Sequence, residues 1–240
     1  ILSLVALYIG AGWLVQGSSA LALKAKISPL VVGLTIVAFG TSAPELVVSL
    51  NATLSGQGDI AIGNIVGSNI FNIGVILGVS ATICPLQVKK QLLRIDIPVM
   101  LAATVLFTIL FWNGTLGRTE GLFFLTGIII YTIFSLFYSR KHGTEGSSQE
   151  LEEQPKHWAV DTLAIVGGLV VLVFASRLLV DNAVSIAKEL GVSEAVIGLT
   201  IVAAGTSMPE LATSIVAAYK RKTDIAIGNI VGSNLFNILT

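Results

Sequence analysis

The sequence predicts an all-α membrane protein built from two inverted copies of one unit, and three observations lead to this prediction. Hydrophobic residues make up 54% of the 240 residues and charged residues 12%, with a mean hydropathy of +0.87. One motif occurs twice in the chain, and lysine and arginine gather in alternate loops. Runs of about 20 apolar residues are long enough to cross the hydrocarbon core of a bilayer as helices.

Eight apolar segments are expected to be membrane helices, with polar residues between them. The segments are about 2–23, 29–54, 59–83, 95–112, 120–138, 158–188, 194–219 and 224 to the last residue. They divide into a first repeat (1–138), a polar linker (139–157) and a second repeat (158–240). In the first repeat two more apolar segments follow the motif, whereas the second repeat stops soon after it. The symmetry therefore predicts ten helices, of which about eight are present.

The repeated motif spans Gly33–Ile73 and returns, without a gap, as Gly198–Ile238 at a constant offset of 165 residues. Over Gly33–Asn72 and its copy, 27 of 40 positions are identical. Such a duplication in apolar sequence, with one glutamate in each copy, is typical of secondary transporters that bind their substrate between two repeats.

The distribution of positive charge predicts the orientation of the chain. If the N-terminus lies outside, the cytoplasmic loops contain 11 lysines and arginines and the outer loops contain two. Positive charge favours the cytoplasmic side. We therefore expect an integral protein of the plasma (inner) membrane, with the linker 139–157 in the cytoplasm. Because an odd number of helices separates equivalent positions, the two copies cross the membrane in opposite senses.

Two acidic residues, Glu45 and Glu210, are expected near the middle of the membrane, and they occupy equivalent positions in the two copies. The other acidic residues are expected in loops or near helix ends. A carboxyl group at that depth costs several kcal/mol, by order of magnitude, and normally marks the path of an ion or proton. The alternative is a structural role, in which both glutamates are protonated and hydrogen-bonded inside the helix bundle.

A proline precedes each of these glutamates, in the sequences GTSAPE and GTSMPE. Pro44 and Pro209 have no N–H, so each is expected to break its helix and to free carbonyl groups around 38–41 and 203–206. Freed carbonyls, hydroxyls and a carboxylate form an all-oxygen ligand set, which suits Ca²⁺ or Na⁺ and does not suit zinc or copper.

The second part of each motif reads GNIVGSNIFN and GNIVGSNLFN. Ser68 and Asn72 are four residues apart and share one face of a helix, as do Ser233 and Asn237. The glycines alone would fit close helix packing. Packing does not require the serine and asparagines beside them, so these side chains are expected to line the cation site.

These motifs in combination resemble the paired alpha-repeats of the calcium/cation antiporter superfamily, in its sodium/calcium exchanger branch. The resemblance implies that Ca²⁺ and Na⁺ are transported substrates that compete for one site in the middle of the membrane. It implies Ca²⁺ binding by Glu45 and Glu210 with the carbonyls of Thr41 and Thr206. The remaining ligands that it implies, mainly for Na⁺, are Ser42, Ser207, Ser68, Ser233, Asn72, Asn237 and the carbonyls of Ala38 and Ala203.

Alternative functions remain open at this point. A proton-driven calcium antiporter would use the same scaffold, and a cation channel would more naturally arrange several subunits around a pore. An enzyme is not expected, because no nucleophile–histidine pair lies in the spans. The sequence implies no cofactor, no nucleic acid and no obligate protein partner beyond the lipid bilayer. Some relatives carry aspartate where this chain has Asn72 or Asn237, which leaves ion stoichiometry and any K⁺ dependence open.

Overall fold

The computed structural model describes residues 1–142, 157–193 and 203–240, and all of its regular elements in these ranges are helices. Five of them are long and apolar enough to cross a membrane: Leu2–Ala25, Gly58–Ile83, Leu92–Asn113, Arg118–Lys141 and Trp158–Glu189. A sixth span consists of two helices, Pro29–Thr41 and Ala43–Leu54, which meet at an angle of 45°. These six correspond to the first six segments expected from the sequence. The start of the seventh lies outside the described residues.

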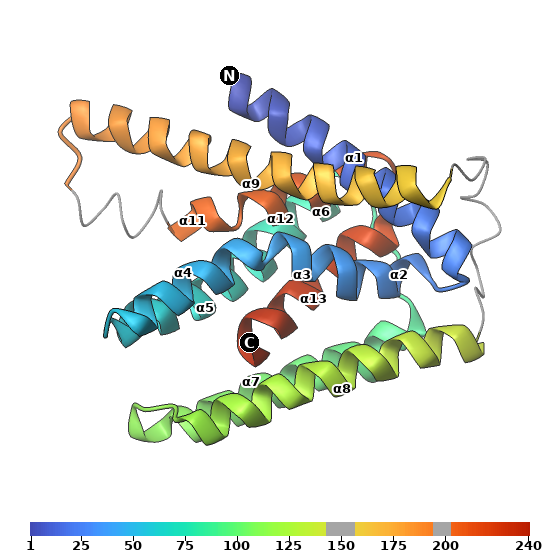
Figure 1. Cartoon of the computed structure of the whole chain (residues 1–240), viewed down its shortest axis with the longest axis horizontal. Coiled ribbons are helices and arrows are strands. Elements are labelled where there is room, and N and C mark those ends of the chain that lie inside the picture. The colour runs from blue at the N-terminus through green and yellow to red at the C-terminus, as the bar shows by residue number, and fades with distance from the viewer. Residues whose placement is uncertain (143–156, 194–202) are drawn as a thin grey trace.

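Helices α1 (Leu2–Ala25) and α9 (Trp158–Glu189) form an antiparallel pair along one side of the molecule (Figure 1). Their backbones approach closely: a Cβ atom on Gly10 would lie 3.0 Å from the Gly168 carbonyl oxygen. At the far end of the pair, Lys24 forms an ion pair with Asp161. These contacts join equivalent first helices of the two repeats.

Helix α2 (Pro29–Val32) leads into the first copy of the motif. This copy contains a π-helical turn at Gly33–Val37, α3 (Ala38–Thr41), α4 (Ala43–Leu54) and α5 (Gly58–Phe71). A second π-helical turn at Asn72–Ile76 continues α5 into α6 (Leu77–Ile83). The second copy contains α11 (Ala203–Thr206), α12 (Met208–Tyr219) and α13 (Thr223–Leu239). Residues 198–202, at the start of the second copy, lie outside the described residues.

Helix α13 runs through the middle of the molecule, and nearly all of its residues are buried. Glycines let it lie against the backbone of the first copy. A Cβ atom on Gly228 would lie 2.6 Å from the Leu30 carbonyl oxygen, and one on Gly232 would lie 2.5 Å from that of Leu34. Close packing is therefore observed at the glycines of this copy, where it holds the two repeats together along their motifs. At Gly63 and Gly67 of the first copy no described atom of another helix lies within 4 Å of such a Cβ atom, so the expected close packing is not observed there.

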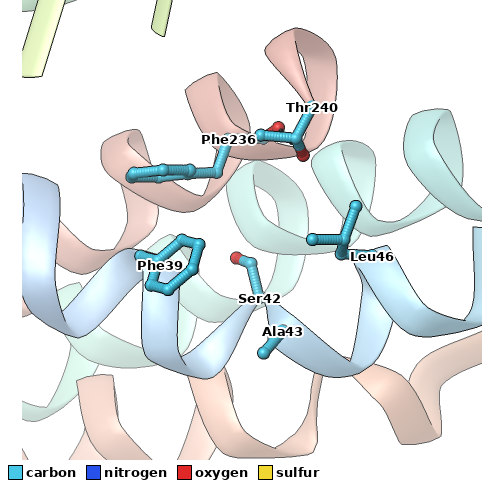
Figure 2. Close-up of a pocket in the computed structure, with 6 residues that line it drawn as sticks. All are labelled: Phe39, Ser42, Ala43, Leu46, Phe236 and Thr240. Carbon is cyan, nitrogen blue, oxygen red and sulfur yellow. Dashed lines mark hydrogen bonds between the residues drawn. The ribbon is translucent and has the colours of Figure 1, made fainter. Parts of the chain in front are cut away.

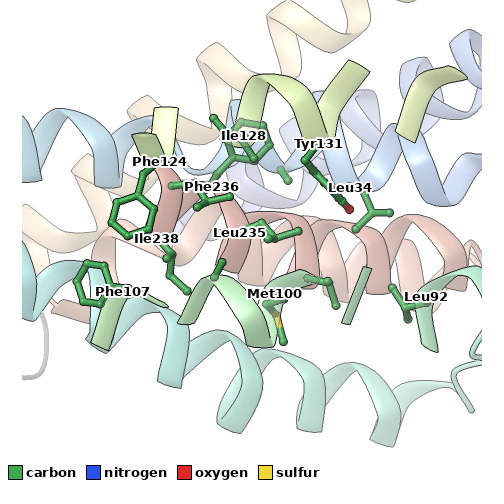
Figure 3. Close-up of a cluster of buried hydrophobic side chains, with 14 of the residues drawn as sticks. Leu34, Leu92, Met100, Phe107, Phe124, Ile128, Tyr131, Leu235, Phe236 and Ile238 are labelled. Carbon is green, nitrogen blue, oxygen red and sulfur yellow. The ribbon is translucent and has the colours of Figure 1, made fainter. Parts of the chain in front are cut away.

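Helices α7 (Ile97–Leu110) and α8 (Arg118–His142) form a hairpin that covers α13. Figure 3 shows the apolar cluster between them, in which Phe107 of α7 and Phe124 of α8 face Ile238 of α13. The ring centroids of Phe107 and Phe124 are 6.1 Å apart. Burial of such aromatic and aliphatic side chains fixes the hairpin against the centre of the fold.

Asp96 corrects one expectation from the sequence. The helix expected to begin at residue 95 begins instead with a π-helical turn at Leu92–Asp96, so Asp96 lies inside the span and is fully buried. The Tyr131 hydroxyl donates a hydrogen bond of 2.9 Å to Asp96 Oδ1. This bond replaces one with water for Oδ1, while Oδ2 has no hydrogen-bond partner among the described residues. A buried acidic side chain other than Glu45 and Glu210 therefore lies inside this span.

Candidate cation site

Two helix breaks, at Ser42 and Ser207, form the centre of the candidate site. Each break stands between a short helix and a second helix with proline in its first turn, as the sequence predicts. The first turn of the second helix also holds the glutamate, Glu45 in α4 and Glu210 in α12. Both glutamates are nearly inaccessible, with 2% and 1% of their surface exposed.

Each glutamate is bonded by the serine of the other copy. The Ser42 hydroxyl donates to Glu210 Oε1, and the Ser207 hydroxyl donates to Glu45 Oε1, both at 2.9 Å. This exchange brings the two breaks and the two carboxylates together at the crossing point of the repeats. In each glutamate the other carboxylate oxygen, Oε2, is buried and has no hydrogen-bond partner among the described residues.

The asparagines of the GNIVG segments connect the two copies next to this centre. The Asn229 amide donates to the Glu210 carbonyl oxygen at 3.4 Å and to the Ser214 hydroxyl at 3.0 Å, and its oxygen accepts from the Thr41 hydroxyl at 3.0 Å. Asn64 makes the equivalent bonds to Glu45, Ser49 and Thr206, at 3.1, 3.0 and 3.5 Å. Since both ends of each amide are bonded to protein, these two asparagines hold the breaks in position.

The asparagines further along the motif pair across the repeats. Asn72 Nδ2 donates to Asn234 Oδ1 at 2.9 Å, and Asn237 Nδ2 donates to Asn69 Oδ1 at 3.0 Å. Asn72 Oδ1 has no partner among the described residues and is fully buried. This orientation leaves the amide oxygen of Asn72, and not its nitrogen, available to a cation.

Ser68 and Ser233 complete the set of buried oxygens. Both side chains are buried, and neither hydroxyl oxygen has a hydrogen-bond partner within the described part of the chain. Together with Glu45 Oε2, Glu210 Oε2 and Asn72 Oδ1 they make five buried oxygens without partners, contributed by both halves of both motifs. A buried polar atom without a partner costs about 1–3 kcal/mol, so a set of five such oxygens requires an explanation.

The carbonyl of Ala38 differs from its expected state. It accepts the Ser42 N–H at 2.9 Å, so the break does not leave it free. Pro44 removes only the N–H one turn after Gly40, which explains why the Ala38 carbonyl keeps its bond. A carbonyl oxygen has a second lone pair, so Ala38 stays a candidate ligand. Only the backbone of Ala203 is described.

One side of the site opens into a small pocket. Figure 2 shows Ser42 at this pocket, between the α3–α4 break and the end of α13, with Phe39 and Phe236 beside it. The centroids of these two rings are 5.5 Å apart. Ser42 is buried, like Thr41 and Ser207, but it is the candidate ligand among the residues that line this pocket.

Ser49 and Ser214 have a part in the site that was not predicted from the sequence. Each lies one turn after its glutamate and accepts the amide of the neighbouring asparagine at 3.0 Å. Their signal was present, because both are identical in the two copies and share a helix face with the glutamates.

Comparison with known proteins identifies the family. The family model for sodium/calcium exchanger protein matches residues 1–137 and 160–240. The chain belongs to the sodium/calcium exchanger family. The chain is 40% identical to the putative antiporter CaxA of Alkalimonas amylolytica, over 100% of this chain and 76% of CaxA. It is 29% identical to the Ca(2+)/H(+) antiporter ChaA of Bacillus subtilis, over 92% of this chain and 68% of ChaA.

A solved structure of this exchanger family has the same fold. The sodium-calcium exchanger NCX_Mj, soaked with 2.5 mM Na⁺ and 0.1 mM Ca²⁺, superposes with a TM-score of 0.84 at 35% identity. The match covers 99% of this chain and 76% of that one. The chain is therefore an integral membrane protein with the inverted-repeat fold of a cation antiporter.

Proposed function

We propose that this exchanger moves Ca²⁺ in one direction and Na⁺ in the other by alternating access, with both ions competing for the site between Glu45 and Glu210. The observation that carries the proposal is the set of five buried oxygens without partners, two of which belong to carboxylates. Hard cations of this kind bind oxygen ligands. Two carboxylates balance the charge of one Ca²⁺, so the bound ion removes the cost of burying them.

Within the described residues no group of three or more histidine, cysteine, aspartate or glutamate side chains could hold a metal ion. A site with two carboxylates and several neutral oxygens favours an ion that must be released again over one that stays bound. Competition between the ions follows, because Na⁺ and Ca²⁺ both need the same two carboxylates. The twelve candidate ligands of the sequence are retained in this proposal, with Ser49, Ser214, Asn64 and Asn229 holding them in place.

The test is uptake of ⁴⁵Ca²⁺ into vesicles that contain the full-length protein. An outward Na⁺ gradient without a pH gradient should drive uptake, and external Na⁺ should inhibit it competitively. The relation to ChaA supports one alternative, exchange of Ca²⁺ for protons on the same scaffold. Uptake that follows an imposed pH gradient and ignores Na⁺ would replace our proposal by that alternative. Passive Ca²⁺ flux without any coupling would indicate a channel.

We also propose that the N-terminus and Gly58 face the outside of the plasma (inner) membrane and that the linker 139–157 faces the cytoplasm. The support is the excess of lysine and arginine in the loops assigned to the cytoplasm. With Cys84, the only cysteine, replaced by serine, Gly58→Cys should react with an impermeant maleimide from outside. Ser147→Cys should react only after the membrane is opened. Labelling of both from one side would contradict the opposite senses of the repeats.

A further inference from the structure

The break in the second copy receives a hydrogen bond from a helix outside the motif. Pro209 has no N–H, so the Gly205 carbonyl lacks the partner that a regular helix would give it one turn later. The Ser176 hydroxyl of α9 donates to this carbonyl oxygen at 2.7 Å, and both residues are buried. A side chain of α9 thus replaces the missing helix bond next to Thr206.

Helix α9 packs directly on the break at this point. A Cβ atom on Gly205 would lie 2.2 Å from Cγ2 of Val180, which is one turn after Ser176 on the same helix. Only glycine fits this distance, so the hydroxyl of Ser176 can reach the backbone of the break. The bond is therefore part of a packed contact between α9 and α11.

The first copy has no equivalent bond donor. At the offset of 165 residues the counterpart of Ser176 is Ala11, which carries no hydroxyl. The break of the first copy also packs on α9, because a Cβ atom on Gly40 would lie 2.5 Å from Cδ1 of Leu169. Helix α9 thus covers both breaks, and a serine bonds only one of them. This departure from symmetry lies beside a site that is otherwise symmetric.

We infer that Ser176 is a positioning residue for the second-copy half of the cation site. By holding the Gly205 carbonyl it fixes the backbone that presents Thr206, Ser207 and Glu210. The inference rests on the proposed function, since it assigns Ser176 a part in Ca²⁺ binding. Loss of one neutral hydrogen bond is expected to weaken binding about two- to tenfold.

Three variants of the full-length protein test this role. Ser176→Ala removes the bond, and Ser176→Thr keeps a hydroxyl at the same place. Ser185→Ala is the matched control, because Ser185 is an exposed serine of the same helix whose hydroxyl bonds only the Asp181 carbonyl at 2.9 Å. The measurements are the Michaelis constant and maximal rate of Na⁺-driven ⁴⁵Ca²⁺ uptake, and hydrogen–deuterium exchange of the backbone at 203–211.

We expect Ser176→Ala to raise the Michaelis constant for Ca²⁺ about two- to tenfold, with little change in maximal rate, and to speed exchange at 203–211. Ser176→Thr should restore both, and Ser185→Ala should change neither. An unchanged Michaelis constant in Ser176→Ala would overturn the inference, even with faster exchange, because the bond would then be only structural. Wild-type vesicles that take up no Ca²⁺ would instead refute the proposed function, and this role of Ser176 with it.

Discussion

Replacement of either central glutamate by glutamine tests the site most directly. In the structure, Oε1 of Glu45 and of Glu210 accepts a serine hydroxyl at 2.9 Å, and Oε2 has no partner among the described residues. Glutamine keeps the shape and the amide oxygen that accepts the serine bond. Glu45→Gln and Glu210→Gln therefore remove one negative charge at Oε2 and change little else.

The loss of Ca²⁺ affinity can be bounded. A carboxylate and a divalent cation about 4 Å apart attract by about 8 kcal/mol at an effective dielectric constant near 20, twice the value for two unit charges. The net loss is smaller, about 4 kcal/mol at most, because the neutral glutamine also avoids the several kcal/mol that burial of a carboxylate costs. A loss of about 1.4 kcal/mol, or tenfold, is the lower limit for removal of half of the balancing charge. We expect Ca²⁺ affinity to fall by about tenfold to about a thousandfold.

The measurement is Na⁺-driven ⁴⁵Ca²⁺ uptake over a range of Ca²⁺ concentrations, with equilibrium Ca²⁺ binding to the purified protein. Glu189→Gln serves as control, because it removes the same charge from an exposed position at the end of α9. By the symmetry of the serine bonds, the two central variants should be impaired to a similar degree. Retention of wild-type affinity in both would show that Ca²⁺ does not bind between these carboxylates.

Two further predictions concern hydrogen bonds that the tertiary structure forms. Asn237→Asp removes the amide that donates to Asn69 at 3.0 Å and adds a third carboxylate, so uptake of Ca²⁺ should persist with a new dependence on pH or K⁺. An unchanged ion and pH profile would assign Asn237 to packing. Tyr131→Phe leaves the buried carboxyl of Asp96 without its 2.9 Å bond and should destabilise the protein by about 1–3 kcal/mol. A wild-type unfolding temperature in detergent would contradict this.

Much of the fold was predictable from the sequence because the membrane constrains it strongly. A helix in lipid must satisfy its own backbone, so long apolar segments between polar loops predict spans well. The broken helix was predictable for a similar reason: Pro44 cannot donate, and the structure shows the break at Ser42, two residues earlier. The start of the span Leu92–Asn113 was not predictable, because the burial of Asp96 depends on Tyr131 of another helix.

The hydrogen-bond partner of the Ser42 hydroxyl could not be predicted from the neighbouring sequence. Ser42 and Glu45 have the spacing of a capping box, in which the serine would bond the backbone of its own helix. The structure shows no such cap; the hydroxyl reaches Glu210 of the other copy. Both arrangements satisfy the hydroxyl, and the sequence does not distinguish them. The packing of α13 against α2 and α3 decides between them, because it brings the two breaks within bonding distance.

The sequence by itself determined which groups are repeated: one glutamate, two hydroxyls before it, and a serine with asparagines after it in each copy. Only the tertiary structure decided their roles. It uses both ends of the Asn64 and Asn229 amides to hold the breaks, and it leaves the Asn72 oxygen and the hydroxyls of Ser68 and Ser233 without partners among the described residues. The physical reason is that the repeat makes the two copies chemically equivalent, so contacts within and between them differ only in geometry. The difference between Ser176 and its counterpart Ala11 is visible in the sequence. The hydrogen bond from Ser176 to Gly205 exists only in the folded chain.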